Sequence, residues 1–342
     1  MTHSFRIGRP ELAGLAQLYH EKIAPDLASQ EAGRKSAVLR ASILTVPIAL
    51  VGIVASLWLW NNATGDGRMM GPLVTFLVLS VVWAMQLAKV HKSAKHSLVG
   101  AVTAHLGWRF SSKAQAPTHF DAYRKFKMLP AHSSSAFEDV ISGDVHGSQF
   151  VMTEMHLQKR SGKRTVTVFR GFALEVDFHQ SFTSTTVVLR DRKLQRRRLG
   201  DMKRVGMASP KWEKMFEAYG TDQVEARVKL DPAFMETLMR LEETVDGKKL
   251  RFAFFADRLH VICETPNRFE PGSMFKPLVD PRRMQKLIDE VEALFGVIDA
   301  VVKRPRASDQ AAAQPQMPAP TYSQMSAPQY RPAPVRPLFG SG

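Results

Sequence analysis

Two uncharged apolar segments, residues 41–60 and 71–88, lie on either side of a polar turn of ten residues. An α-helix of about 20 residues spans the roughly 30 Å hydrocarbon core of a bilayer. Each segment is therefore long enough to cross a membrane once. Neither segment has the polar stripe that a helix on a soluble core usually keeps. The sequence predicts a transmembrane hairpin of two helices, residues 41–60 and 71–90.

The rest of the chain divides around this hairpin. Residues 1–40 are predicted to form a cytoplasmic helical segment, and residues 91–130 a helical connector. Residues 131–303 are numerous enough to bury a core of their own, so we expect them to form a cytoplasmic domain. Residues 304–342 are rich in Pro, Ala and Gln and have few large aliphatic side chains. They are predicted to be a disordered tail.

Charges at the ends of the apolar segments predict the orientation of the hairpin. Several Lys and Arg residues precede the first segment and follow the second, whereas the turn between them has only Arg68, close to Asp66. Loops rich in Lys and Arg remain in the cytoplasm, so both termini are expected there. The net charge of +15 agrees with a partner of negative charge, such as the anionic face of a membrane.

The soluble part shows both strand and helix patterns. Alternating apolar residues predict strands at 137–145, 150–157, 165–178, 185–189 and 223–230, and a hairpin over 250–264. Asp231 and Pro232 are typical of a helix start. A broad apolar stripe over residues 280–302 favours a long helix laid on a sheet. The expected fold class is α+β: a transmembrane helical hairpin, then a mixed domain with an antiparallel sheet and a long C-terminal helix, then the tail.

The strongest charged feature is a basic run between two predicted strands, with eight basic and two acidic residues. Its basic residues are Arg190, Arg192, Lys193, Arg196, Arg197, Arg198, Lys203 and Arg204. Near an anionic leaflet each such residue contributes on the order of 1 kcal/mol of attraction. We therefore predict contact with lipid or with a protein partner, and a solvated loop is the alternative. Nucleic acid is not favoured, because no aromatic residues alternate with the charges.

Further residues resemble a known family. They are Asp139, Gly143, Glu154, Phe169 and Gly171, followed by Phe216, Asp222, Glu225 and Arg227 within the segment 212–227. In this pattern the chain is similar to a bacterial membrane-protein family described only as a domain of unknown function. The resemblance covers roughly residues 30–302. It implies a two-span protein of the bacterial inner membrane with a cytoplasmic α+β domain, and it implies no catalytic residue.

Motifs of known chemistry are missing from the sequence. There is no glycine-rich phosphate loop and no nucleophile elbow. His260 and Cys263 are three apart in a predicted strand, so they point to opposite faces and do not chelate a metal together. A helix cap or an ion pair within a loop explains Asp222, Glu225 and Arg227 without catalysis. We expect no metal and no cofactor.

These observations favour a non-enzymatic, membrane-anchored binding module or scaffold. Its expected partners are membrane lipids and a protein that the sequence does not identify. One alternative is a membrane-associated enzyme that uses Asp139, Glu154 or Asp222 as its carboxylates. Another is an accessory subunit of a larger membrane assembly, since a hairpin without charges can pack against other spans.

Overall fold

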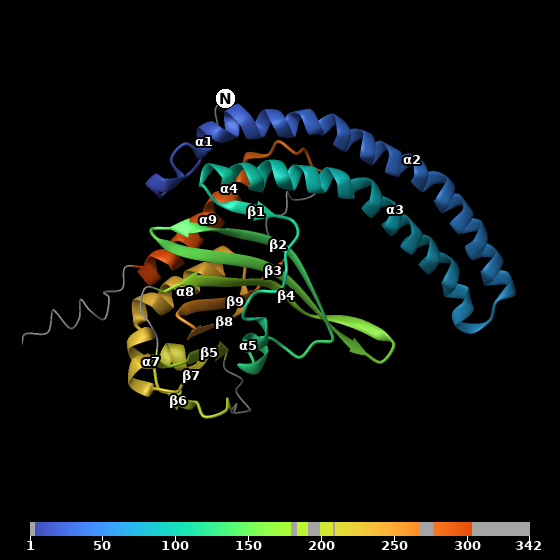
Figure 1. The fold of residues 1–342 in the computed structure, drawn as a ribbon. Helices are drawn as coiled ribbons and strands as arrows, with labels where there is room; N and C mark the ends of the chain where they lie inside the picture. Colours follow the sequence, from blue (N-terminus) through green and yellow to red (C-terminus); the bar gives the residue numbers. More distant parts are fainter. Residues whose placement is uncertain (1–3, 179–182, 191–198, 208, 267–275, 303–342) are drawn as a thin grey trace, which may run out of the picture. The chain divides into compact units, whose positions relative to one another are not determined.

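The computed structural model describes residues 4–178, 183–190, 199–207, 209–266 and 276–302 (Figure 1). The predicted tail, residues 304–342, lies outside these ranges. The described part begins with two long apolar helices and continues into an antiparallel sheet that carries a long C-terminal helix. The α+β class expected from the sequence is therefore confirmed.

The two long helices form an antiparallel hairpin. Helix α2 spans Ala24–Asn62 and α3 spans Met70–Lys95, and the short helix η3 (Gly65–Met69) joins them. The side chain of Gln30 donates to the Ser97 hydroxyl at 2.7 Å, beyond the end of α3. Near the middle of the pair, the indole of Trp83 donates to the Thr45 hydroxyl at 3.0 Å. The helices are thus in contact along most of their length.

Both helices are candidate membrane spans. The helical stretches Pro10–Asn62 and Gly65–His105 are long and apolar enough to cross a membrane. Only 6% of the most apolar window in each stretch is buried, whereas the core helix of a soluble protein would be mostly buried. Large side chains such as Leu50, Val51 and Phe76 are exposed along the hairpin. These features indicate membrane association.

The hairpin is longer than a bilayer requires. The 39 residues of α2 measure about 58 Å at 1.5 Å per residue, against about 30 Å of hydrocarbon. Residues 10–40 and 89–105 therefore continue beyond the apolar segments, and we call them the stalk. Besides the ends of α2 and α3, the stalk contains η1 (Pro10–Leu12), α1 (Leu15–Leu18), η2 (Tyr19–Ile23), η4 (His96–Gly100) and α4 (Ala101–His105).

The described strands form a nine-stranded sheet in the order β1-β2-β3-β4-β9-β8-β5-β7-β6. Their bounds are β1 Arg109–Ser111, β2 Ser134–Val145, β3 Ser148–Ser161, β4 Arg164–Asp177, β5 Thr186–Arg190, β6 Lys203–Val205, β7 Phe216–Gly220, β8 Lys248–Phe255 and β9 Arg258–Glu264. All pairs among these strands are antiparallel. The remaining helices are α5 (Phe120–Lys125), α6 (Pro210–Glu213), α7 (Gln223–Lys229), α8 (Pro232–Thr244) and α9 (Pro281–Val302).

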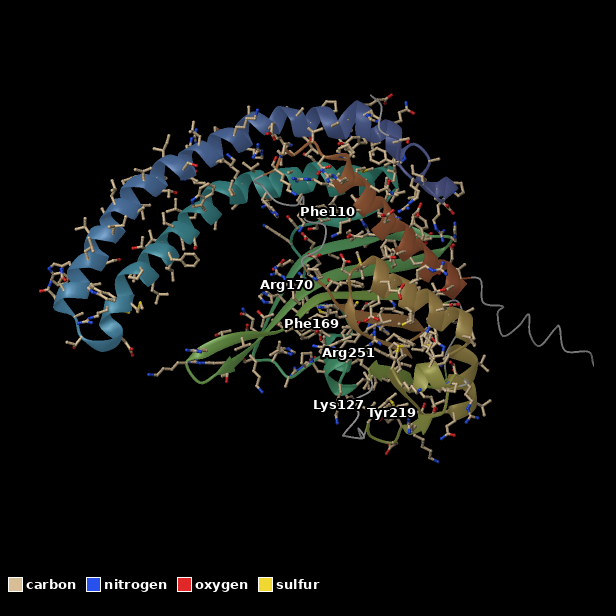
Figure 2. All side chains as sticks on the ribbon, turned by 180° about the vertical axis from the view of Figure 1, so that it is seen from behind. Phe110, Lys127, Phe169, Arg170, Tyr219 and Arg251 are labelled. Carbon is tan, nitrogen blue, oxygen red and sulfur yellow. The ribbon has the colours of Figure 1, made fainter. Side chains whose placement is uncertain are left out.

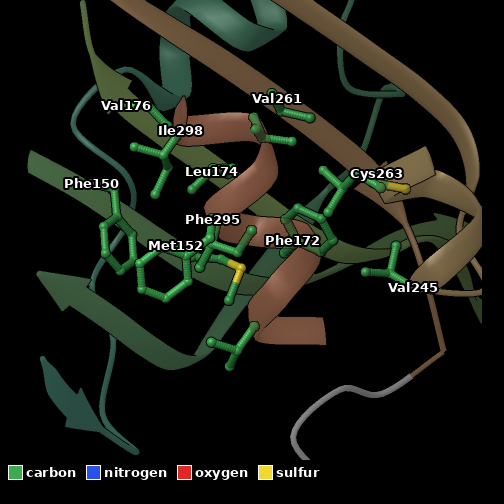
Figure 3. Packing of buried hydrophobic residues seen from close by; sticks show 14 of the residues in the cluster. Phe150, Met152, Phe172, Leu174, Val176, Val245, Val261, Cys263, Phe295 and Ile298 are labelled. Carbon is green, nitrogen blue, oxygen red and sulfur yellow. The ribbon is translucent and has the colours of Figure 1, made fainter. Parts of the chain in front are cut away.

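The sheet has a hydrophobic cluster on each face. On one face, which we call the α9 face, sheet residues such as Phe150, Met152 and Phe172 pack with Phe295 and Ile298 of α9 (Figure 3). Residues of α8 and of the stalk belong to the same cluster. The other face, the α5 face, has a smaller cluster built from α5 and the sheet. The α9 helix thus takes the position predicted from its broad apolar stripe.

One predicted strand is a helix. The sequence predicts a strand at 223–230, but the structure has α7 there and places the strand β7 just before it. The alternation of Val224, Ala226 and Val228 suggested a strand. In the structure Val224 and Val228 are 71% and 62% exposed, while Ala226 is buried. The Asp222 carboxylate accepts hydrogen bonds from the first backbone N–H groups of α7, which starts the helix.

Candidate functional site

The two glycines in the family-like set lie where another segment approaches the backbone closely. A Cβ atom on Gly171 would lie 2.0 Å from the carbonyl oxygen of Cys263, on the neighbouring strand β9. On Gly143 it would lie 2.3 Å from the indole of Trp108. Phe169 and Phe216 are buried in the two hydrophobic clusters. Packing therefore accounts for these four residues.

Two carboxylates of the same set, Asp139 on β2 and Glu154 on β3, lie at opposite positions of neighbouring strands. The register between these strands shifts at residues 138–139, which lie opposite Glu154. Asp139 is 4% exposed and Glu154 is 5% exposed. The ammonium group of Lys95, at the end of α3, forms an ion pair with Asp139. A buried carboxylate requires such a partner, and here the pair fastens the stalk to the sheet.

The remaining three residues of the set belong to α7 or its cap. Asp222 caps the helix. The Glu225 carboxylate lies 2.7 Å from the ammonium of Lys229 and accepts a hydrogen bond from the Thr183 hydroxyl at 2.8 Å. Arg227 is exposed. Local structure thus explains Asp222 as a helix cap and Glu225 as a member of an ion pair, in agreement with the interpretation made from the sequence.

The structure describes three residues of the basic run. The guanidinium of Arg190, at the end of β5, pairs with Glu242 and lies 4.5 Å from the centre of the Phe216 ring. Lys203 and Arg204 are exposed on β6, at the edge of the sheet opposite β1. The other basic residues of the run, Arg192, Lys193, Arg196, Arg197 and Arg198, lie outside the described residues.

A second basic surface was not predicted as a site. The ends of β3 and β4 form a two-stranded arm over residues 158–167, in which Ser161 pairs with Arg164. All side chains from 159 to 167 are exposed. The arm contains Lys159, Arg160, Lys163 and Arg164, and residues 157–168 include no acidic residue. We call it the basic arm. The sequence feature that could have revealed the basic arm is the four basic residues within residues 159–164, a segment that was interpreted only as a hairpin loop.

The stalk has a basic groove of about 690 Å³ between its two helices. Among the residues that line it are Lys22, Lys89, Lys92 and His96, together with Asp26. Lys89 and Lys92 come directly after the second apolar segment. The groove therefore begins where the hairpin ceases to be apolar.

A cluster of four polar side chains lies on the α5 face of the sheet. Glu175 of β4 and His260 of β9 are direct register partners. Tyr123 of α5 and His119, which precedes α5, cover them. The Nδ1 atom of His119 lies 3.3 Å from Oε1 of Glu175, and the Tyr123 hydroxyl lies 3.0 Å from Nδ1 of His260. The same hydroxyl contacts Oε1 of Glu175. We call these residues the His–Glu–Tyr cluster.

Burial keeps two members of this cluster, His260 and Tyr123, uncharged. His260 is fully buried and Glu175 is 4% exposed. Burial, and then the charge of His119, lowers the pKa of His260 from 6.5 to about 3, so its imidazole is neutral at pH 7. Burial, and then the Glu175 carboxylate, raises the pKa of Tyr123 well above 10, so the phenol keeps its hydrogen. The Phe255 ring stacks on His260 with the ring centres 3.8 Å apart.

Sequence reasoning missed this cluster because its members are distant in the chain. Tyr123 and His260 are separated by 137 positions. The available signal was a single polar residue inside each of two short apolar runs: Glu175 within residues 172–176 and His260 within residues 259–263. The surrounding face also carries Phe169, Tyr219 and Arg251, which are labelled in the view from behind in Figure 2.

Comparisons with known proteins find a family resemblance over part of the chain but no activity. The curated proteins gave no match. Among solved structures, the chain is similar to the crystal structure of the mycobacterial trehalose monomycolate transport factor A, TtfA, with 11% sequence identity and a TM-score of 0.31. That alignment covers 58% of this chain and 93% of the other. Residues 167–303, from β4 to just beyond α9, match the model of the family described as "Protein of unknown function (DUF3137)", which confirms the expected resemblance to a domain of unknown function.

Proposed function

We propose that this chain is a membrane-anchored, non-enzymatic binding module of a bacterial inner membrane. In this proposal the apolar hairpin crosses the bilayer, both termini are cytoplasmic, and the α+β domain contacts anionic lipid. The observation that carries the proposal is the direction of the basic arm relative to the apolar hairpin.

Contacts between the stalk and the sheet give this direction. Lys95 pairs with Asp139 in the middle of β2. Trp108, which follows the stalk, donates to the carbonyl oxygen of Asp144 at 3.3 Å, close to the turn between β2 and β3. Moving along the stalk away from the apolar hairpin thus corresponds to moving along β2 towards this turn. The basic arm is at the opposite end of β3, so it extends towards the hairpin.

The arm is also long enough to reach lipid headgroups. From Lys95 back to residue 88, where the apolar segment ends, seven residues of helix measure about 10 Å. From Glu154, which lies opposite Asp139 in the register, to Ser161 at the tip, seven residues of strand measure about 23 Å. Because this length exceeds about 10 Å, the arm can reach the level of residue 88, where the headgroups would begin, even if its strands are inclined to the helices. Its four basic side chains and those of the basic groove would meet the anionic leaflet together.

The basic run has a different position. Lys203 and Arg204 lie on β6, whereas the stalk contacts β1 at the other edge of the sheet. We therefore assign lipid contact to the basic arm, and leave the run to a protein partner or to solvent. The enzyme alternative receives no support from Asp139 and Asp222, because an ion pair and a helix cap account for them.

A fluorescent label at the arm tests the proposal. Ser161→Cys places a thiol at the tip, while the natural Cys263 is fully buried and protected from labelling. The full chain carries an environment-sensitive dye there and is inserted into nanodiscs. We expect emission at shorter wavelength in discs with phosphatidylglycerol than in discs of phosphatidylcholine alone. The difference should decrease at 1 M salt, where the Debye length is about 3 Å.

The control variant separates the arm from general basic charge. Replacing the four basic residues of the arm by Gln should abolish the wavelength difference. The matched change Lys203→Gln with Arg204→Gln removes exposed charge at the far edge of the sheet and should preserve it. Equal emission in both kinds of disc, or the same loss in both variants, rejects lipid contact by the arm.

A further inference from the structure

In the His–Glu–Tyr cluster a single hydroxyl hydrogen lies between two acceptors. Nε2 of His260 lies 3.2 Å from the carbonyl oxygen of Phe255, which can only accept, so Nε2 carries the ring hydrogen. Nδ1 of His260 therefore presents a lone pair to the cluster. The Tyr123 hydroxyl touches both this nitrogen and Glu175, but it has a single hydrogen to donate. One of the two acceptors is left facing lone pairs, and a cation between them would resolve this.

We propose that His119, Glu175 and His260 bind a divalent transition-metal ion, with Zn²⁺ as the first candidate. Their ligand atoms all lie within 4.8 Å of one another. Oε1 of Glu175 is 3.3 Å from Nδ1 of His119 and 3.8 Å from Nδ1 of His260. In a tetrahedral zinc site with bonds of 2.0–2.1 Å, neighbouring donors are about 3.3–3.4 Å apart. Two imidazoles and one carboxylate form a donor set that zinc accepts.

The surroundings of the cluster resemble the outer shell of metal sites. A metal-binding histidine commonly donates its other ring N–H to a carbonyl or carboxylate, as His260 does to Phe255. The stacked Phe255 ring fixes the plane of the imidazole. The second oxygen of Glu175 lies 3.4 Å from the guanidinium of Arg258, which orients the carboxylate and leaves Oε1 for the ion. The Tyr123 hydroxyl is close enough to act as a fourth donor.

The ion would enter from the side of His119 and would have a structural role. The His119 side chain is 23% exposed, whereas Glu175 and His260 are buried. The three ligands come from the segment before α5, from β4 and from β9. A bound ion would thus tie α5 to the sheet. This inference concerns the α5 face alone and does not depend on the proposed lipid contact.

Metal binding by the purified full chain tests the inference. The protein is treated with EDTA in detergent and then dialysed against Zn²⁺ or Co²⁺. We expect about one equivalent of either metal to remain bound, and Co²⁺ to give the visible absorption bands of a four-coordinate site. His119→Ala should weaken binding at least 10-fold, since it removes the accessible ligand, and Glu175→Gln should have a similar effect.

The matched variant His156→Ala removes a histidine outside the cluster and should leave binding unchanged. If Glu175→Gln fails to fold, His119→Ala still decides the question, because this residue lies at the edge of the cluster. Circular dichroism confirms the fold of each variant. No retained metal in the wild-type chain, or equal retention after His119→Ala, overturns the proposal.

Discussion

At Gly171 the carbonyl group of Cys263 on the adjacent strand occupies the place of a side chain. Because both the glycine and the obstructing atoms belong to backbone in the interior of a sheet, neither can yield without moving a strand. Gly143 is limited by the Trp108 ring, which is a side chain and can adjust. The family-like glycines are thus explained by the lack of room for a side chain and not by a chemical role.

Gly171→Ala should therefore destabilise the domain. Overpacking of this kind costs about 1–3 kcal/mol, which corresponds to a decrease of several degrees in the Tm of a domain of this size. The measurement is thermal unfolding of the full chain in detergent, followed by tryptophan fluorescence. Gly33→Ala is the matched control, because nothing lies within 4 Å of its Cβ position in α2 and alanine favours a helix. Equal Tm values for the two variants would contradict this explanation.

Some residues could be placed from the sequence because their role is local. Asp231 was predicted to start a helix, and its side chain accepts a hydrogen bond from the backbone N–H of Phe234. A helix cap depends on neighbours within a few positions, so a short window contains the information. Glu175 and His260 become partners only through the pairing of β4 with β9, which no local pattern specifies.

At the scale of elements, the ion pair between Lys95 and Asp139 joins two parts of the chain that have no common pattern in sequence. α3 ends at Lys95, and Asp139 lies at a register shift in β2. The sequence indicated Asp139 only through the family resemblance. Its partner could not be predicted, because Lys95 resembles the other cations that follow the second apolar segment.

Lys95→Met should lower the stability of the domain strongly. It leaves the Asp139 carboxylate buried without its ammonium partner, a loss that costs about 3–5 kcal/mol. The double change with Asp139→Asn should recover much of this, because the buried charge is removed as well. Unfolding temperatures of the single and double variants measure both effects.

The comparison variant is Lys249→Met, in which the lysine is 62% exposed and pairs with Glu264. Exposed pairs contribute about 0–1 kcal/mol, so its Tm should change little. A Lys95→Met variant as stable as this one would show that the stalk does not depend on the ion pair.

At the scale of the whole molecule, the length of the apolar segments and their lack of charge were sufficient to predict the helical hairpin. The order of nine strands was not predictable, because β9 inserts beside β4 and β5 pairs with β8, and such distant pairings leave no local pattern. The strand β7 was missed for a different reason. All five of its residues are buried, so its sequence lacks the alternation of apolar and polar residues by which a half-exposed strand is found.

The orientation of the hairpin makes a separate prediction for intact cells. Asp66→Cys places a thiol in the turn between the helices, and Lys163→Cys places one on the basic arm. A maleimide that does not cross the inner membrane should label the first variant in intact cells and the second only after permeabilisation. The wild-type chain, with its buried Cys263, provides the background. The opposite labelling pattern would reverse the assigned orientation.

The helices of the hairpin pass from the apolar segments into the stalk without a loop, and the stalk packs on the sheet. A helix pair in a thinner bilayer responds by tilting, and in a thicker one it stands more upright. In the proposed membrane-spanning arrangement no flexible joint separates the apolar segments from the sheet, so such a tilt would rotate the domain together with the stalk. The angle at which the domain meets the membrane would then follow bilayer thickness.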